Sequence, residues 1–229
     1  MKPGDDLGAL LNAVPYEPGD VLVVAHKVVS KAEGALRRLD DVTVSERARA
    51  LARDQGKDPR HVQVVLDESA AIVRAERGVL ICRTRHGFVC ANAGVDASNA
   101  PAAGTVVTLP RDPDASARAL RAALSTTPAV VIADSFGRAW RHGQCDVAIG
   151  IAGLTALDDW RGRRDPVGLE LRATTIAIAD EAAAAADLVR DKASREPAVV
   201  IRGLARFVTD EDGPGAAPLV RAVEEDLFR

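Results

Sequence analysis

The sequence predicts a mixed α+β fold, in which several small sheets are flanked by helices, and three observations support this prediction. Short apolar runs recur along the chain and are bounded by glycine, proline or aspartate, as buried strands often are. Helical patterns separate some of these runs but not all, so the strict strand–helix alternation of a parallel sheet is missing. The composition is that of a globular protein, with 47% hydrophobic and 28% charged residues. We expect one domain over residues 1–229.

The first third of the chain is expected to hold one buried strand and two helices. Val21–Val24 is a continuous apolar run typical of a buried strand. Ser45 can cap a helix that Gly56 ends, and another short helix follows Pro59.

The remainder is expected to alternate irregularly between strands and helices. Further strands are expected over residues 79–82, 87–90, 129–133, 147–151 and 198–201. A helix is expected to begin at Asp114 or Ser116, and an alanine-rich helix is expected to run from Asp180 to near Lys192. Residues 210–217 are rich in glycine, proline and aspartate, which predicts a loop before a final amphipathic helix.

Composition and charge argue against several classes of protein. Only 3% of the residues are aromatic and the net charge of −3 mixes both signs, so neither base stacking nor a nucleic-acid surface is indicated. No apolar run approaches the roughly 20 residues that span a bilayer, and no secretory signal is evident. Cys82, Cys90 and Cys145 lack paired spacing, which favours a reducing cytoplasm over disulfides or a thiolate zinc site.

Two carboxylates are the first candidates for chemistry. Asp96 and Asp134 each follow an apolar, strand-like approach, so each is expected where a buried strand reaches a loop. Two such carboxylates suit a hard divalent cation that bridges nucleotide phosphates, and Ser135 can add a hydroxyl ligand. The alternative is that these aspartates only bond their own backbone in turns.

Basic residues at two places are the next candidates. Lys27 and Lys31, with Ser30 between them, follow the first strand and can neutralise phosphate oxygens, although a solvated loop is the simpler reading. Walker A and G-x-G-x-x-G patterns are both absent. Arg138 and Arg141 can hold an anionic substrate group, or else belong to an exposed basic turn.

A serine or cysteine hydrolase is not indicated. His142 has no nucleophile beside it in any recognisable motif, and the other histidines are scattered.

Several segments, taken in order, resemble the F420-0:gamma-glutamyl ligase family. The matching stretches are 19–24 (GDVLVV), 27–34 (KVVSKAEG), 92–99 (NAGVDASN), 134–138 (DSFGR), 148–153 (AIGIAG), 179–181 (ADE) and 197–204 (PAVVIRGL). Each stretch alone is weak, but the ordered set covers the chain from about Gly4 to Leu204 and is specific.

The resemblance implies a fold, an assembly and a set of ligands. It implies the mixed α+β fold of that family in an intertwined homodimer, with GTP as co-substrate, Mg²⁺ or Mn²⁺ as cofactor, and K⁺ as a further ion. By position, the metal-binding residues of the family match Asp96, Asp134 and Ser135. The nucleotide contacts match Asn99 and the first-loop residues His26, Lys27 and Lys31, and Arg138 joins the two aspartates as a candidate catalytic residue.

The chain departs from the family pattern at four places. His26 and Lys27 stand where the family often has a hydroxyl pair, and Lys192 stands where some members have a metal-binding glutamate. Family members usually carry a further segment before the equivalent of Gly4, which is expected to be missing here. The C-terminal nitroreductase-like domain of some bacterial relatives is also expected to be absent.

The function that the resemblance implies is addition of L-glutamate to coenzyme F420-0 by a GTP-dependent ligase, in the cytoplasm. Repeated addition of gamma-linked glutamates is compatible with it. Two alternatives stay open: a nucleotide- or flavin-binding homologue without ligase activity, and an amide ligase that acts on a different acid. In each case the partners are small molecules and a second copy of the chain, with neither nucleic acid nor a membrane.

Overall fold

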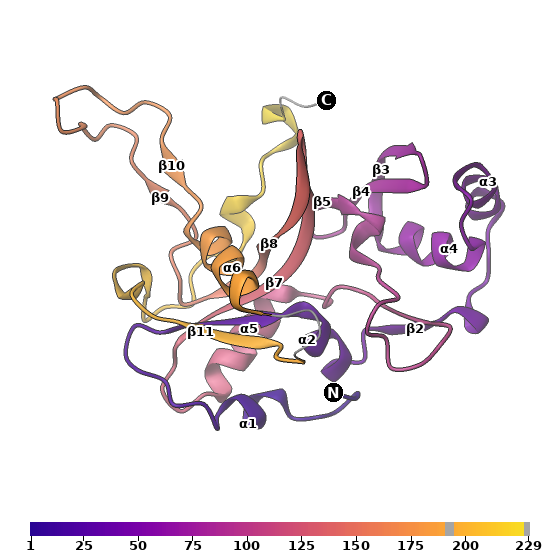
Figure 1. Cartoon of the computed structure of the whole chain (residues 1–229), viewed down its shortest axis with the longest axis horizontal. Helices are drawn as coiled ribbons and strands as arrows, with labels where there is room; N and C mark the ends of the chain where they lie inside the picture. The colour runs from indigo at the N-terminus through magenta and orange to yellow at the C-terminus, as the bar shows by residue number, and fades with distance from the viewer. Residues whose placement is uncertain (191–194, 227–229) are drawn as a thin grey trace.

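A four-stranded sheet lies at the centre of the fold, with the strand order β11-β1-β7-β8 (Figure 1). The strands are β1 (Val21–Ala25), β7 (Ala129–Arg138), β8 (Arg141–Ala152) and β11 (Ala198–Ile201). β1 and β7 are parallel, whereas β11 and β8 pair antiparallel to their neighbours. The computed structural model describes residues 1–190 and 195–226 of the chain.

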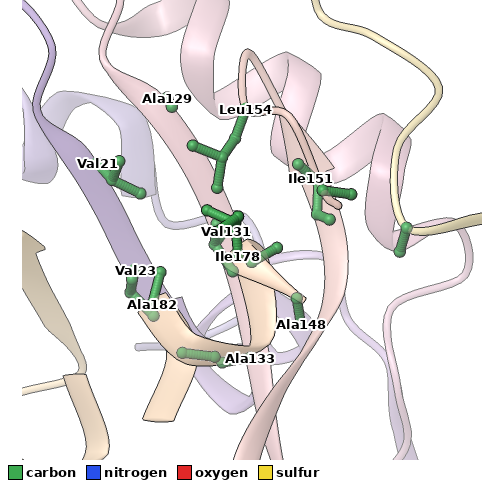
Figure 2. Close-up of a cluster of buried hydrophobic side chains, with 14 of the residues drawn as sticks. Val21, Val23, Ala129, Val131, Ala133, Ala148, Ile151, Leu154, Ile178 and Ala182 are labelled. Atoms are coloured by element: carbon green, nitrogen blue, oxygen red, sulfur yellow. The ribbon is translucent and has the colours of Figure 1, made fainter. Parts of the chain in front are cut away.

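Helices cover both faces of this sheet, because β1 is apolar at every position. Successive side chains of a strand point to opposite faces, so Val21 and Val23 pack with helix α6 (Ile178–Val189), as Figure 2 shows. Leu22 and Val24 pack on the other side, where three helices lie. These are α1 (Leu7–Leu11), α2 (His26–Ala32) and α5 (Pro113–Ala123). The result is a helix–sheet–helix sandwich.

A second group of elements has its own core. It consists of α3 (Glu46–Gln55), α4 (Pro59–Glu68) and the sheet β3 (Ser69–Glu76), β4 (Val79–Thr84) and β5 (Val89–Ala91). The predicted cap of α3 is confirmed, since the Ser45 hydroxyl accepts from the Ala48 amide and Gly56 ends the helix at φ +64°. The cross-strand pair Cys82 and Cys90 is buried and free, and burial raises the pKa of Cys90 to about 12.

The remaining strands are short. The pairs are β2 (Leu36–Arg38) with β6 (Thr105–Val107), and β9 (Asp158–Asp159) with β10 (Thr175–Ile176). The 3₁₀ turns are η1 (Leu39–Asp41), η2 (Asn92–Gly94), η3 (Ala205–Phe207), η4 (Ala217–Leu219) and η5 (Val223–Glu225). The segment from β9 to β10 extends away from the body as an arm (Figure 1), and Val167 and Leu169 on it are 80% and 68% exposed.

The mixed α+β prediction is confirmed, but several boundaries differ. The strand predicted over residues 129–133 continues to Arg138, so Asp134 lies within β7 and not at its end. The helix predicted from Asp114 or Ser116 begins at Pro113, with Asp112 as its cap. β3 was not predicted at all, because the irregular register of this strand against β4 obscures its alternation.

The C-terminal part differs most from the prediction. The alanine-rich helix ends at Val189, and Lys192 lies outside the described residues. Within the part that ends at residue 226, the predicted final helix is replaced by the turns η4 and η5. The β-branched residues Val220 and Val223 have low helix propensity, which favours this outcome. Among the described helices, none combines the length and the apolarity that crossing a bilayer requires.

Candidate active site

A cavity of about 870 Å³ opens beyond the carboxyl end of β1. β1 stops at Ala25, which pairs with Ala133, whereas β7 continues past that point. One edge of β7 is therefore free of β1 at Asp134 and Ser135, and both of these residues line the cavity. Their side chains leave opposite faces of the strand, so the cavity receives groups from both layers of the sandwich.

The helix α2 begins directly after β1 and brings basic groups to the cavity. Lys27 and Lys31 lie one helical turn apart, on the same face, and both line the cavity. Burial, and secondarily the charge of Lys27, lower the pKa of the Lys31 ammonium. An anionic ligand beside Lys31 would offset both effects.

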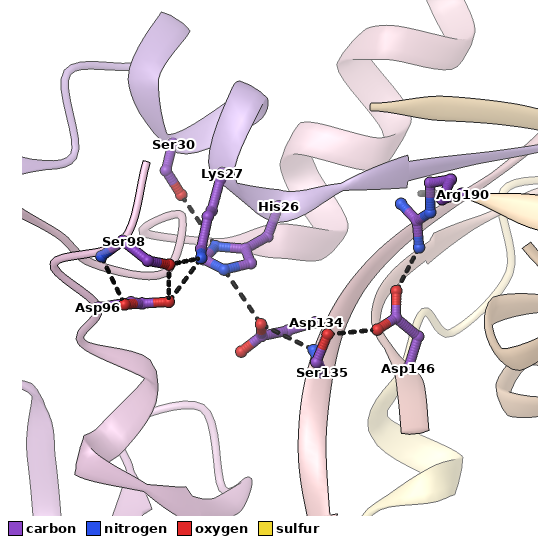
Figure 3. Close-up of polar contacts among 9 residues, drawn as sticks. All are labelled: His26, Lys27, Ser30, Asp96, Ser98, Asp134, Ser135, Asp146 and Arg190. Atoms are coloured by element: carbon purple, nitrogen blue, oxygen red, sulfur yellow. Dashed lines mark hydrogen bonds and ion pairs between the residues drawn. The ribbon is translucent and has the colours of Figure 1, made fainter. Parts of the chain in front are cut away.

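His26 links α2 to β7. Its Nε2 lies 3.2 Å from Asp134 Oδ1, and its Nδ1 lies 3.4 Å from the Ser30 hydroxyl (Figure 3). His26 is only 2% exposed, so the ring is fixed between a carboxylate of the strand and a hydroxyl of its own helix. The arrangement holds the Asp134 side chain against α2.

Asp96 reaches the cavity from the second group of elements. A left-handed turn at Asn92, Ala93 and Gly94, with φ values of 52°, 53° and 73°, precedes it. The Asp96 backbone then exchanges two hydrogen bonds with Val107 of β6, which fixes its position. Within the segment 92–99, a left-handed backbone turn therefore brings Asp96 to the cavity, and no long strand leads up to it.

The Asp96 carboxylate is paired with Lys27. Lys27 Nζ donates to Asp96 Oδ2 at 2.5 Å and also to the Ser98 hydroxyl at 2.7 Å (Figure 3). Burial would raise the pKa of Asp96, but the hydrogen bonds from Lys27 and Ser98 outweigh it and hold the pKa below its ordinary value. Asp96 is thus ionised at neutral pH.

On the other face of β7, Ser135 contacts Asp146, which in turn pairs with Arg190, and the sequence pointed to neither as a site residue. The Ser135 hydroxyl donates to Asp146 Oδ1 at 2.6 Å, and Arg190 pairs with Asp146 Oδ2 (Figure 3). Asp146 and Arg190 both line the cavity. The sequence could have pointed to Asp146, because it is a charged residue directly before the predicted strand 147–151. Its contact with Ser135, however, follows only from the pairing of β7 with β8.

The structure brings most of the predicted residues together, with one exception. Seven of the predicted residues line the cavity, although they come from segments far apart in the sequence. They are His26, Lys27, Lys31, Asp96, Asn99, Asp134 and Ser135. Arg138 does not line the cavity, since its guanidinium donates to the carbonyls of His142 and Gly143 at the hairpin turn, at 2.6 and 3.4 Å. Arg141 is likewise exposed on this hairpin.

The oxygen donors of the cavity suit a hard divalent ion, but basic side chains of the protein already pair with both carboxylates. Asp96, Asp134 and Ser135 offer carboxylate and hydroxyl oxygens, the ligand types that Mg²⁺ and Mn²⁺ prefer. Across residues 1–190 and 195–226, no three acidic, histidine or cysteine side chains converge closely enough to form a ready metal cage. The donor set therefore fits such an ion, on condition that Lys27 releases Asp96.

Comparison with known proteins identifies the family of the chain. The sequence model described as F420-0:Gamma-glutamyl ligase matches residues 1–203. The coenzyme F420:L-glutamate ligase of Methanopyrus kandleri is 47% identical, over 100% of this chain and 93% of the relative. The proteins of the same name from Methanothermobacter thermautotrophicus and Methanocaldococcus jannaschii are 44% and 42% identical, over 99% and 98% of this chain and 93% and 90% of their own lengths. The chain belongs to the F420-0:gamma-glutamyl ligase family.

Proposed function

We propose that the protein is a ligase that joins L-glutamate to coenzyme F420-0 with GTP as the energy source. One observation carries the proposal: residues that the family resemblance assigns to metal and nucleotide come from three separate segments and line one cavity. The volume of about 870 Å³ lies within the range of small-molecule and cofactor sites, roughly 300–1,000 Å³. The names of the relatives mention coenzyme F420 and L-glutamate, and the description of the family mentions F420-0.

The proposed chemistry activates a carboxylate before an amine attacks it. The carboxylate of the acceptor attacks the γ-phosphorus of GTP, the bond to the bridging oxygen breaks, and GDP leaves. The glutamate amine then attacks the resulting acyl phosphate, the carbon–nitrogen bond forms, inorganic phosphate leaves, and the amine loses a proton. Without activation the leaving group would be oxide, which is why a carboxylate needs this step.

Within the cavity, the basic and acidic residues have separate tasks in this proposal. Lys27, Lys31 and Asn99 bind the nucleotide, with the two ammonium groups next to the phosphates. Asp96, Asp134 and Ser135 would hold Mg²⁺ or Mn²⁺. When bound, that ion neutralises charge on the transferred phosphoryl group. We also propose K⁺ as a further ion and the cytoplasm as the compartment of the protein.

Arg138 is proposed to contact the acceptor outside the cavity. It lies on the β7–β8 hairpin, which continues from Ser135. A long acidic acceptor can extend along this hairpin, where the exposed Arg141 adds a second guanidinium group.

Mass spectrometry of the reaction tests the proposal. The full chain is incubated with F420-0, L-glutamate, GTP and Mn²⁺, and we expect a product heavier by one glutamyl unit that requires all four components. With ¹⁸O in the acceptor carboxylate, one label should appear in the released phosphate. A nucleotide-binding protein without activity would give no product, and a ligase for another acid would hydrolyse GTP only with that acid; either result rejects the proposal.

A further inference from the structure

We infer that Asp146 is a positioning residue of the metal site and that it acts through the hydroxyl group of Ser135. The inference rests on the proposed function, because it concerns the ion that Asp96 and Asp134 would hold. No motif of the family pattern described above includes Asp146, although this residue lines the same cavity.

The backbone places Ser135 and Asp146 directly opposite each other. They form one register pair of the β7–β8 ladder, so their side chains leave the same face of the sheet. The distance from Ser135 Oγ to Asp146 Oδ1 is 2.6 Å (Figure 3). An ionised carboxylate can only accept, so the serine must donate its single proton to Asp146. The lone pairs of the serine oxygen are then turned away from Asp146, as a metal ligand requires.

Arg190 fixes the charge and the orientation of Asp146. The Arg190 guanidinium pairs with Asp146 Oδ2, and the two side chains are only 8% and 5% exposed. A buried carboxylate beside a permanent cation stays ionised, and its two oxygens have different partners. Arg190 also donates to the Pro197 carbonyl at 3.5 Å, which connects the end of α6 to the start of β11. Asp146 thus supports Ser135 from a fixed position.

The substitution Asp146→Asn should reverse the direction of this hydrogen bond. The amide has one accepting oxygen and one donating nitrogen, and Arg190 can bond only to the oxygen. The nitrogen then donates to Ser135, whose own proton has to turn elsewhere, and the serine oxygen becomes a poorer ligand. Changes in the groups that orient metal ligands typically weaken metal affinity by about 10–100-fold.

A double-substitution cycle with Mn²⁺ alone tests the inference. Free Mn²⁺ is measured by electron paramagnetic resonance during titration of the full chain, in wild type, Ser135→Ala, Asp146→Asn and the double variant. We expect each single substitution to weaken Mn²⁺ binding at least about tenfold. The double variant should match Ser135→Ala within about twofold, because Asp146 then has no hydroxyl to orient. Asp146→Glu, which can only accept, should bind Mn²⁺ more tightly than Asp146→Asn.

Other outcomes separate the inference from the proposed function. If Asp146→Asn weakens Mn²⁺ binding by the same factor with and without the Ser135 hydroxyl, Asp146 acts by its charge or as a ligand, and the inference is wrong. An unchanged affinity in Asp146→Asn also overturns it, as does an Asp146→Glu variant no better than Asp146→Asn. If the wild-type chain takes up no Mn²⁺, the metal assignment of the proposed function fails as well. Thermal unfolding of each variant shows whether the fold is kept.

Discussion

In the cavity, three carboxylates are each paired with a basic side chain of the same chain. Asp96 pairs with Lys27, Asp134 contacts His26, and the third carboxylate pairs with Arg190. Carboxylates gathered around one space repel one another unless cations lie between them. These internal pairs allow the site to form without a metal ion, and a bound ion has to replace at least one of them.

Lys31→Ala should weaken the binding of GTP more than that of glutamate. Loss of one charged contact to a phosphate costs about 1.5–3 kcal/mol, which is roughly tenfold to a hundredfold in affinity. Steady-state kinetics with each substrate varied in turn measure the two KM values. Arg53→Ala, which removes an exposed cation of α3 outside the cavity, is the control. Equal effects on both KM values would indicate general damage, and an effect on glutamate alone would reverse the assignment.

Lys27→Met should have opposite effects on the metal ion and on GTP. Asp96 loses its counter-ion and becomes freely available, so Mn²⁺ alone should bind about two- to fivefold more tightly, as the modest strength of half-exposed ion pairs suggests. GTP should bind more weakly, because one ammonium group is lost. Calorimetric titration with Mn²⁺ and with GTP separately measures both. Weaker binding of Mn²⁺ would show that Lys27 does not compete with the ion.

At the scale of single elements, local signals predicted the core but not the hairpin that carries the site. The β1 strand and the ends of α3 follow from residues within a few positions of one another, such as the Ser45 cap and Gly56. The β7–β8 hairpin depends on pairing across strands, which a single sequence does not display. Hence Asp134 was expected at the end of a strand, and the Ser135–Asp146 contact was missed.

Gly150→Ala should destabilise this hairpin. A methyl group at Gly150 would lie 2.3 Å from the Pro113 carbonyl oxygen, where α5 begins, so the strand and the helix would have to separate. We expect the free energy of unfolding to fall by about 1–3 kcal/mol, as overpacked cores generally show. Gly137→Ala on the same hairpin is the matched control, since open space surrounds it and its φ is not positive. Denaturant titration measures both variants, and equal effects would contradict the packing argument.

For the whole molecule, we propose a homodimer in solution. The family resemblance implies one, and the arm between β9 and β10 exposes Val167 and Leu169 well away from either core. Light scattering at micromolar protein should give twice the 24.1 kDa of one chain. The substitutions Val167→Asp and Leu169→Asp test whether the arm takes part, because they would shift the mass towards one chain. A wild-type mass of 24.1 kDa would reject the dimer.

The central claim, that this cavity is the site of ligation, is tested most directly by Asp134→Asn. The substitution keeps the size of the side chain and one accepting oxygen, but removes the charge that a divalent ion requires. Formation of the glutamylated product, measured by mass spectrometry at limiting Mn²⁺, should fall by at least about a hundredfold, or roughly 2.7 kcal/mol, with the thermal unfolding temperature nearly unchanged. Asp54→Asn on α3, outside the cavity, should retain wild-type turnover. Near-normal turnover of Asp134→Asn would contradict the account.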